Sequence, residues 1–238
     1  LTGRITRYHF APTERAQQNL RAENTPESHI WVTGNTVIDA LLWVRDRVAA
    51  RRDWGDAFGA ATPVVLGGDR IVLITGHRRE NHGQGFEDLC AGIADSARRH
   101  PSTHYIYPVH LNPKVQEPVN RLLGGLANVH LIDPLPYEPF VYLMNRAAVV
   151  LTDSGGIQEE APSLGKPVLV MREVTERPEA VAAGCVKVVG THPERIATEL
   201  HALLNDDDPY AAMAQAANPF GDGTAAQQIV DILKGASR

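Results

Sequence analysis

The stretch that decides the fold reads Leu151-Thr152-Asp153-Ser154-Gly155-Gly156-Ile157-Gln158-Glu159-Glu160. A hydrophobic run over residues 147–151 leads into it and predicts a buried strand, and the two adjacent glycines predict a turn. Helical spacing then relates Ile157, Ala161 and Leu164, so an amphipathic helix begins directly after the turn. The segment is therefore predicted to be a strand, a glycine turn and a helix.

This arrangement directs unpaired backbone N–H groups and the positive end of a helix toward one point, where a phosphate binds favourably. Ser154 adds a hydroxyl donor beside Gly155 and Gly156, and Glu160, about two turns into the helix, can accept hydrogen bonds from a ribose diol. A strand-to-helix loop that binds no ligand has the same pattern, because short glycine motifs occur in both settings.

Strands and helices alternate in the same way from residue 70 onward. The expected strands are 71–75, 104–109, 129–132, 148–152, 167–171 and 186–189, with helices at 85–99, 113–123 and 137–147. The chain is expected to be helical after residue 205, to break at 218–223, and to end in a helix that stops near Lys234. This alternation predicts an α/β fold with a doubly wound parallel sheet, in which ligands bind at the carboxyl ends of the strands.

Four segments are expected along the chain. Residues 1–50 contain only two strand–helix pairs, too few to cover both faces of a sheet, so they are predicted to be the C-terminal remnant of a preceding Rossmann-like domain. Residues 51–69 are predicted to be a linker, 70–217 a Rossmann-like domain, and 218–238 a helix that packs back toward the first domain. Because the chain begins with Leu1, it is expected to be part of a longer protein.

Composition excludes several classes of protein. The chain has 238 residues, of which 43% are hydrophobic and 21% charged, as expected for a soluble globular protein. A net charge of −5 without a basic stripe argues against nucleic acid, and the lack of 18 consecutive apolar residues argues against a membrane span. Cys90 and Cys185 lie in apolar segments and are expected in the core. A cytoplasmic location is predicted.

A second cluster of polar residues follows the strand at 71–75. His77, Arg78 and Arg79 stand at its carboxyl end, where arginines can clamp a diphosphate and a histidine can act as donor or acid. A solvated loop is the alternative interpretation. The sequence contains no metal-binding spacing, no Gly-x-x-x-x-Gly-Lys phosphate loop and no Gly-x-Ser-x-Gly nucleophile motif.

Three further residues each have two interpretations. His110 follows the next strand and either joins the site or caps the following helix. Arg177 either reaches a phosphate or sugar, or forms a surface ion pair with Glu173 or Glu176. Phe140 either flanks a base or belongs to the core.

Several long motifs, in order, together resemble one family. They are Thr-Gly-His-Arg-Arg-Glu-Asn at 75–81, Tyr-Pro-Val-His-Leu-Asn-Pro at 107–113, the stretch from Leu151 to Arg172, Thr-Glu-Arg-Pro-Glu-Ala at 175–180, Val-Thr-Gly-Asn-Thr-Val-Ile-Asp-Ala-Leu at 32–41 and Asn-Pro-Phe-Gly-Asp-Gly at 218–223. This set is similar to the bacterial non-hydrolysing UDP-N-acetylglucosamine 2-epimerases.

The resemblance implies a glycosyltransferase-B-like architecture and an isomerase that acts on nucleotide sugars. Such enzymes interconvert UDP-N-acetylglucosamine and UDP-N-acetylmannosamine by eliminating UDP and adding it back, without cofactor or metal, and they supply precursors for cell-surface polysaccharides. It also implies that residues 70–217 bind the nucleotide sugar and that the protein is a homodimer.

The resemblance also assigns residues. It implies a UDP site in which the diphosphate meets Ser154, Gly155, Gly156, Arg177 and His77, the ribose meets Glu160, and the uracil meets Phe140 and the backbone near Leu135. His77 is the implied catalytic residue. Leu135 departs from the polar residue that some members carry, which leaves its side-chain contact open.

Two more points follow from the resemblance. A second UDP-N-acetylglucosamine is expected to bind as an activator near Arg78, Arg79 and His110. The family's Gly-Thr-Arg-Pro-Glu loop and its proton-transferring acids do not occur in this sequence, so the chain alone is expected to be inactive. A glycosyltransferase of the same architecture and a binding module without catalysis remain the alternatives.

Overall fold

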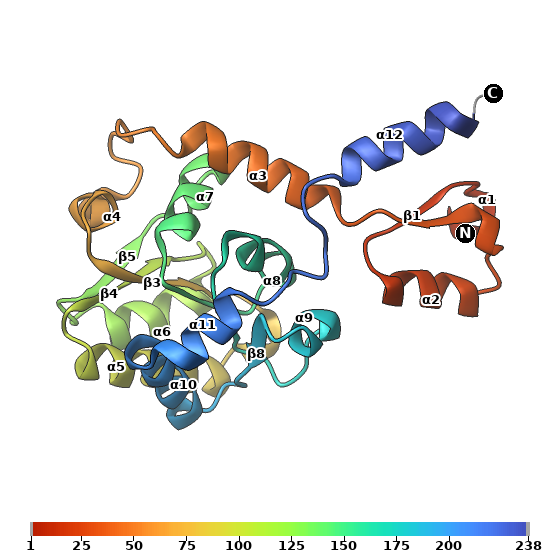
Figure 1. The fold of residues 1–238 in the computed structure, drawn as a ribbon. Coiled ribbons are helices and arrows are strands. Elements are labelled where there is room, and N and C mark those ends of the chain that lie inside the picture. Colours follow the sequence, from red (N-terminus) through yellow and green to blue (C-terminus); the bar gives the residue numbers. More distant parts are fainter. Residues whose placement is uncertain (1, 237–238) are drawn as a thin grey trace. The chain divides into compact units, whose positions relative to one another are not determined.

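The computed structural model describes residues 2–236, which form two units (Figure 1). Within the described chain, unit 1 comprises residues 2–43 and 218–236, and unit 2 comprises residues 44–217. No helix among these residues has both the length and the apolar character needed to cross a lipid bilayer.

Unit 2 is built on a six-stranded parallel sheet. Its strands are β3 (Arg70–Thr75), β4 (Thr103–Pro108), β5 (Val129–Ile132), β6 (Val149–Thr152), β7 (Val168–Val170) and β8 (Val186–Val188). All neighbours pair in parallel in the order β5-β4-β3-β6-β7-β8, so the direction in which the chain adds strands reverses between β3 and β6. The predicted strands and the predicted α/β class are confirmed.

Helices cover both faces of this sheet (Figure 1). One face carries α5 (Gln84–Arg99), α6 (Pro113–Leu123) and α10 (Pro193–Asn205), and the other carries α7 (Tyr137–Arg146) and α8 (Gly155–Glu160), which continues as the 3-10 helix η4 (Ala161–Leu164). The short α9 (Pro178–Ala182) precedes β8, and α11 (Asp207–Ala214) follows α10.

Alternation along the strands explains why both faces are covered. Val72 and Ile74 of β3 belong to the core cluster that includes Phe86 of α5. Ile71 and Leu73 alternate to the opposite face and are equally buried. A strand that is hydrophobic on both sides is stable only between two helical layers.

Helix α10 was not predicted from the sequence, which was expected to be helical only after residue 205. Its first residue is Pro193, and its buried positions include Ile196 and Leu200. Proline is favoured in the first turn of a helix because its missing N–H would have no partner there. Together with the four-residue apolar spacing, Pro193 was therefore an available signal for this helix.

The segment predicted to be a linker, residues 51–69, is instead part of unit 2. It contains the 3-10 helix η2 (Gly59–Ala61) and α4 (Thr62–Leu66). Trp54 and Phe58 are buried, and their rings pack against Tyr142 of α7 at centroid distances of 4.8 and 6.1 Å. Aromatic rings at this spacing attach the segment to α7, which a free linker would not do.

Unit 1 holds a two-stranded parallel sheet of β1 (His9–Ala11) and β2 (Ile30–Val32). Around it lie α1 (Thr2–Ile5), α2 (Glu14–Ala22), η1 (Glu27–His29), the first part of α3 (Thr36–Val48) and α12 (Ala225–Ala236). The break at 218–223 returns to the start of α3, where a Cβ added to Gly34 would lie 3.1 Å from Gly221 Cα. Glycine is required at such a close approach of two backbones.

Candidate functional site

The candidate site lies where the strand order reverses, at the carboxyl ends of β3 and β6. These strands are neighbours, with Thr75 opposite Thr152, and the two hydroxyl oxygens lie 2.5 Å apart. The loop that carries His77 and the loop that carries Ser154 therefore begin side by side. Open α/β sheets bind ligands in the crevice at this kind of reversal.

The Ser154 turn has the geometry of a helix N-terminus. Ser154 is extended, with φ −83° and ψ 134°, and α8 begins at Gly155. Within the described chain the Ser154 side chain caps no N–H of this helix. A Cβ atom added to Gly156 would meet open space. A Cβ atom added to Gly155 would lie 3.7 Å from Arg177 Nη2 and 3.8 Å from Arg78 Nη2. Two guanidinium groups thus flank the start of α8, which makes the turn strongly favourable for an anion.

Arg177 forms an ion pair other than the two surface pairs that the sequence left open. Its Nε donates to the buried Glu159, and its Nη1 donates to the Glu176 backbone carbonyl at 3.2 Å. The Glu176 carboxylate pairs with Arg172 at 3.4 Å, and Glu173 accepts from a backbone N–H beyond β8. The alternative interpretation, a surface pair with Glu173 or Glu176, is therefore wrong, and Glu159 holds the guanidinium beside the helix start.

Asp153 fixes the His77 loop. It is fully buried, and its Oδ2 accepts hydrogen bonds from the backbone N–H groups of His77 and Arg78, both at 2.8 Å. Its Oδ1 lies 3.7 Å from His77 Nδ1 and has no hydrogen-bond partner among residues 2–236. Tyr107 adds a second restraint, because its hydroxyl donates to the Gly76 carbonyl at 2.7 Å.

Burial raises the pKa of the Asp153 carboxyl, while the two N–H donors of the loop act in the opposite direction. Asp153 has no role among those predicted from the sequence. A carboxylate placed directly after a buried strand was the available signal, because a group in that position is buried at the strand end and must find donors nearby.

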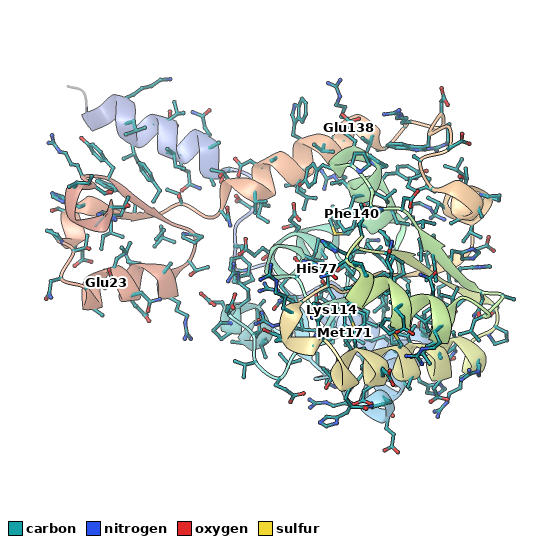
Figure 2. The ribbon with its side chains drawn as sticks, turned by 180° about the vertical axis from the view of Figure 1, so that it is seen from behind. Glu23, His77, Lys114, Glu138, Phe140 and Met171 are labelled. Carbon is teal, nitrogen blue, oxygen red and sulfur yellow. The ribbon has the colours of Figure 1, made fainter. Side chains whose placement is uncertain are left out.

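His77 and His110 meet at the same edge of the sheet. The His77 side chain, labelled in Figure 2, is 46% exposed. Its ring stacks on that of His110, with centroids 5.3 Å apart and planes 13° apart. His110 Nδ1 also accepts from the Asn112 N–H at 3.1 Å, so it both joins the site and supports the start of α6. Arg79 begins η3 (Arg79–Asn81) and is exposed; no hydrogen bond or ring contact of the described residues joins it to His110.

Glu160 ends α8 and is buried, with 6% of its surface exposed. Its Oε1 accepts a 2.5 Å hydrogen bond from the hydroxyl of Tyr137, the first residue of α7. Burial raises the pKa of this carboxyl, and the neighbouring Glu159 adds to the effect. Leu135, in the loop before α7, and Phe140, one turn into α7 (Figure 2), are both half-buried. Tyr137 was not assigned a role from the sequence.

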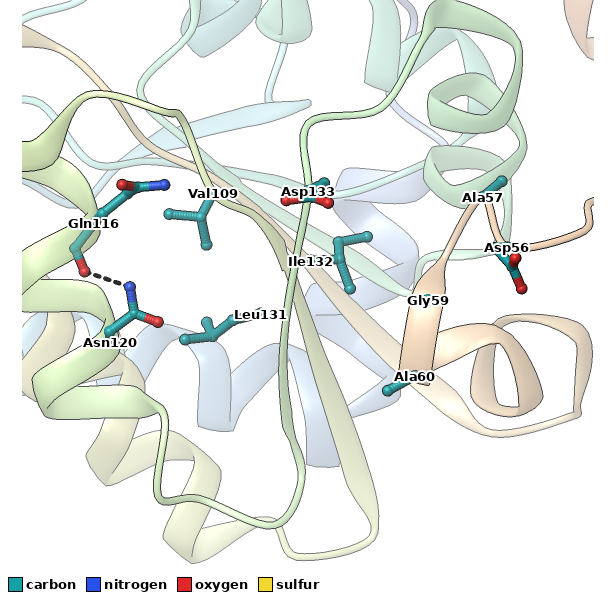
Figure 3. A pocket seen from close by; sticks show the side chains of 10 residues that line it. All are labelled: Asp56, Ala57, Gly59, Ala60, Val109, Gln116, Asn120, Leu131, Ile132 and Asp133. Carbon is teal, nitrogen blue, oxygen red and sulfur yellow. Dashed lines mark hydrogen bonds between the residues drawn. The ribbon is translucent and has the colours of Figure 1, made fainter.

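A separate polar pocket of about 300 Å³ lies beside β5 (Figure 3). Gln116 and Asn120 of α6 line one side, and Asn120 Nδ2 donates to the Gln116 carbonyl at 2.7 Å. Asp56 lines another side, and Val109 and Asp133 follow the ends of β4 and β5. None of the site residues predicted from the sequence lines this pocket. Within residues 2–236, no group of three or more His, Cys, Asp or Glu side chains could hold a metal ion.

Comparison with known proteins gives one consistent family. The family model described as UDP-N-acetylglucosamine 2-epimerase matches residues 1–234. Over 234 residues the chain is 56% identical to the UDP-N-acetylglucosamine 2-epimerase of Escherichia coli strain K12, covering 98% of this chain and 62% of that protein. The chain thus spans less than two thirds of the length of this curated relative.

Solved structures agree. The Neisseria meningitidis UDP-GlcNAc 2-epimerase bound to UDP-GlcNAc is 45% identical with a TM-score of 0.90, over 98% of this chain and 63% of that chain. S. aureus MnaA, solved with UDP, is 38% identical with a TM-score of 0.86, over 98% of this chain and 61% of that chain. These matches extend through both units and include the site at the ends of β3 and β6, and the chain belongs to the UDP-N-acetylglucosamine 2-epimerase family.

Proposed function

We propose that the full-length protein interconverts UDP-N-acetylglucosamine and UDP-N-acetylmannosamine by epimerisation at C2. One observation carries the proposal: the N-terminus of α8 is flanked by the guanidinium groups of Arg78 and Arg177, at the point where the strand order of the sheet reverses. This is an anion site of the kind that holds a nucleotide diphosphate. Relatives solved with UDP-GlcNAc or UDP support the choice of nucleotide.

In this proposal each part of UDP has a partner in unit 2. The diphosphate receives hydrogen bonds from the backbone N–H groups of Gly155 and Gly156 and from the Ser154 hydroxyl, while the two arginines neutralise its charge. The ribose donates to Glu160. The uracil occupies the space bordered by Phe140 and the backbone near Leu135.

The proposed chemistry requires a proton to leave C2 and the C1–oxygen bond of the sugar to break. UDP then departs with the bonding electrons, and a 2-acetamidoglucal remains. UDP adds back to C1 while a proton enters C2 from the opposite face. His77 donates to the departing oxygen of UDP, a contact that stabilises the transition state more than the ground state. Arg78 and Arg177 hold the separated UDP in place between the two half-reactions.

Three further proposals concern the whole protein. Arg78, Arg79 and His110 contribute to binding a second UDP-N-acetylglucosamine as an activator. The protein is a homodimer, which light scattering of the full-length protein in solution would test. It acts in the cytoplasm, which cell fractionation would test.

The function is tested by incubating the full-length protein with UDP-N-acetylglucosamine in D₂O and recording proton NMR spectra. The proposal expects UDP-N-acetylmannosamine with deuterium at C2, because elimination and re-addition exchange that proton with solvent. Sugar transfer to an added acceptor without formation of the epimer would favour a glycosyltransferase. Binding of UDP without either reaction would favour a binding module.

A further inference from the structure

We propose that Tyr137 is a positioning residue that makes this site selective for nucleotides with an intact ribose diol, by fixing the Glu160 carboxylate that meets the diol. The inference rests on the proposed function, since it takes UDP as the ligand. Tyr137 acts on the bound nucleotide indirectly, by holding Glu160.

The geometry joins two helices at one hydrogen bond. Tyr137 is the first residue of α7 and Glu160 the last of α8, and the Tyr137 hydroxyl donates to Glu160 Oε1 at 2.5 Å. Glu160 is buried, whereas 42% of Tyr137 is exposed. An O–H···O⁻ bond of this length is in the range of strong, charge-assisted hydrogen bonds.

This bond limits how the carboxylate can turn. The last torsion of a glutamate side chain is broad, so an unanchored carboxylate samples many orientations. Tyr137 holds Oε1, and no hydrogen bond from residues 2–236 reaches Oε2. Oε2 is therefore presented in one orientation to a donor from outside the protein, and the second lone pair of Oε1 remains for a neighbouring hydroxyl. Two adjacent acceptors held in a plane match the two donors of a vicinal diol.

The same bond favours the charged form of Glu160. Burial and the adjacent Glu159 both raise the pKa of the Glu160 carboxyl, and the Tyr137 hydroxyl opposes them by donating to the ionised oxygen. Among the described residues, the charged group that acts on the carboxylate is Glu159 of the same helix, whose own charge is paired with Arg177. A protonated carboxyl accepts hydrogen bonds poorly. Removing the Tyr137 hydroxyl should therefore raise the pKa of Glu160 further. As the pH is lowered, UDP binding should then begin to weaken at a higher pH than in the unmodified protein.

The experiment separates the hydroxyl from the ring. Dissociation constants for UDP, 2′-deoxy-UDP and 3′-deoxy-UDP are measured by calorimetry on the full-length protein, Tyr137→Phe, Glu160→Gln and the double variant. The unmodified protein should prefer UDP to each deoxy form by about tenfold or more, the scale for one hydrogen bond to a charged group. In Tyr137→Phe the preference for UDP over each deoxy form should fall to within about threefold. The dissociation constants of the deoxy forms themselves should change little. The double variant should have the same preference for UDP as Glu160→Gln alone.

Tyr142→Phe is the matched control, because it makes the same change on the same helix. The Tyr142 ring packs against Trp54 and Phe58, and the hydroxyl that bonds Glu160 is that of Tyr137, so removing the Tyr142 hydroxyl should leave the preference for UDP intact. Thermal melting of each variant confirms that the fold is retained.

Other outcomes overturn the inference in distinguishable ways. An unchanged preference in Tyr137→Phe would show that the hydroxyl does not position Glu160. Equal weakening of UDP and both deoxy forms would place Tyr137 on the base or the phosphates. If the unmodified protein fails to bind UDP, the proposed function fails first and this inference with it.

Discussion

Asp153 connects the loop after β6 with the loop after β3 through one carboxylate oxygen. It follows β6 directly, yet its Oδ2 binds the N–H groups of His77 and Arg78 on the loop after β3. A buried carboxylate of this kind is stable only because charge-assisted hydrogen bonds replace its hydration. The backbone of the loop that carries His77 is therefore fixed by a residue that directly follows the neighbouring strand.

At the residue scale, His77→Ala in the full-length enzyme is expected to lower kcat by about 100-fold or more, since a positioned acid or oxyanion donor contributes on that order. UDP affinity should fall much less, because the arginines and the α8 N-terminus remain. Steady-state kinetics and UDP calorimetry together measure both effects. His192→Ala is the control, as His192 is exposed at the start of α10. A variant that keeps kcat and only raises KM would make His77 a binding residue.

Some residue contacts were open to prediction and others were not. His77, Ser154 and Glu160 stand in motifs that follow strands, so their place at the carboxyl edge was predictable from spacing. The partner of Arg177 was not, because Glu159 lies 18 residues away in sequence and becomes its neighbour only when α8 and the loop after β7 are folded together. Local spacing favoured Glu173 and Glu176, which lie within four residues of Arg177.

At the element scale, the same limit applies to α5 and α10. Each helix has an apolar stripe, but neither stripe predicts that α10, which follows the last strand, packs against α5. The contact is recorded at Gly92, where an added Cβ would lie 2.9 Å from the Pro193 carbonyl oxygen and 3.1 Å from Ile196 Cβ. The prediction of a linker at 51–69 was wrong for a similar reason. Its Pro and Gly residues suggested an open segment, whereas Trp54 and Phe58 attach it to α7.

The α5–α10 contact gives a prediction about stability. Gly92→Ala should destabilise the protein by about 1–3 kcal/mol, because overpacking against backbone atoms forces a shift of one helix. Gly85→Ala is the matched control in the same helix, since its Cβ would have only ordinary contacts at 3.9 Å. The control should be neutral or more stable by up to about 1 kcal/mol, the gain in helix propensity. Urea unfolding followed by circular dichroism measures both. Equal stability of the two variants would contradict the tight α5–α10 contact.

At the scale of the whole molecule, all predicted UDP contacts lie in unit 2, between residues 77 and 177. The family motifs made this part predictable, since they are long and occur in order. The boundaries of the units were harder to place. The division falls inside α3, whose buried apolar residues Leu41, Val44 and Val48 continue across the boundary without any local break.

Residues 1–238 tested alone are expected to bind UDP but to epimerise UDP-N-acetylglucosamine at least about 100-fold more slowly than complete enzymes of this family, the scale of one general acid or base. Removing the C2 proton needs a base within reach, and each carboxylate at the site already has a structural partner through at least one of its oxygens. Asp153 holds the His77 loop, Glu159 pairs with Arg177, and Glu160 bonds Tyr137. Calorimetry with UDP shows whether the site is formed, and proton NMR follows the epimer. Turnover at the rate of the E. coli relative would show that residues 1–238 supply the base themselves.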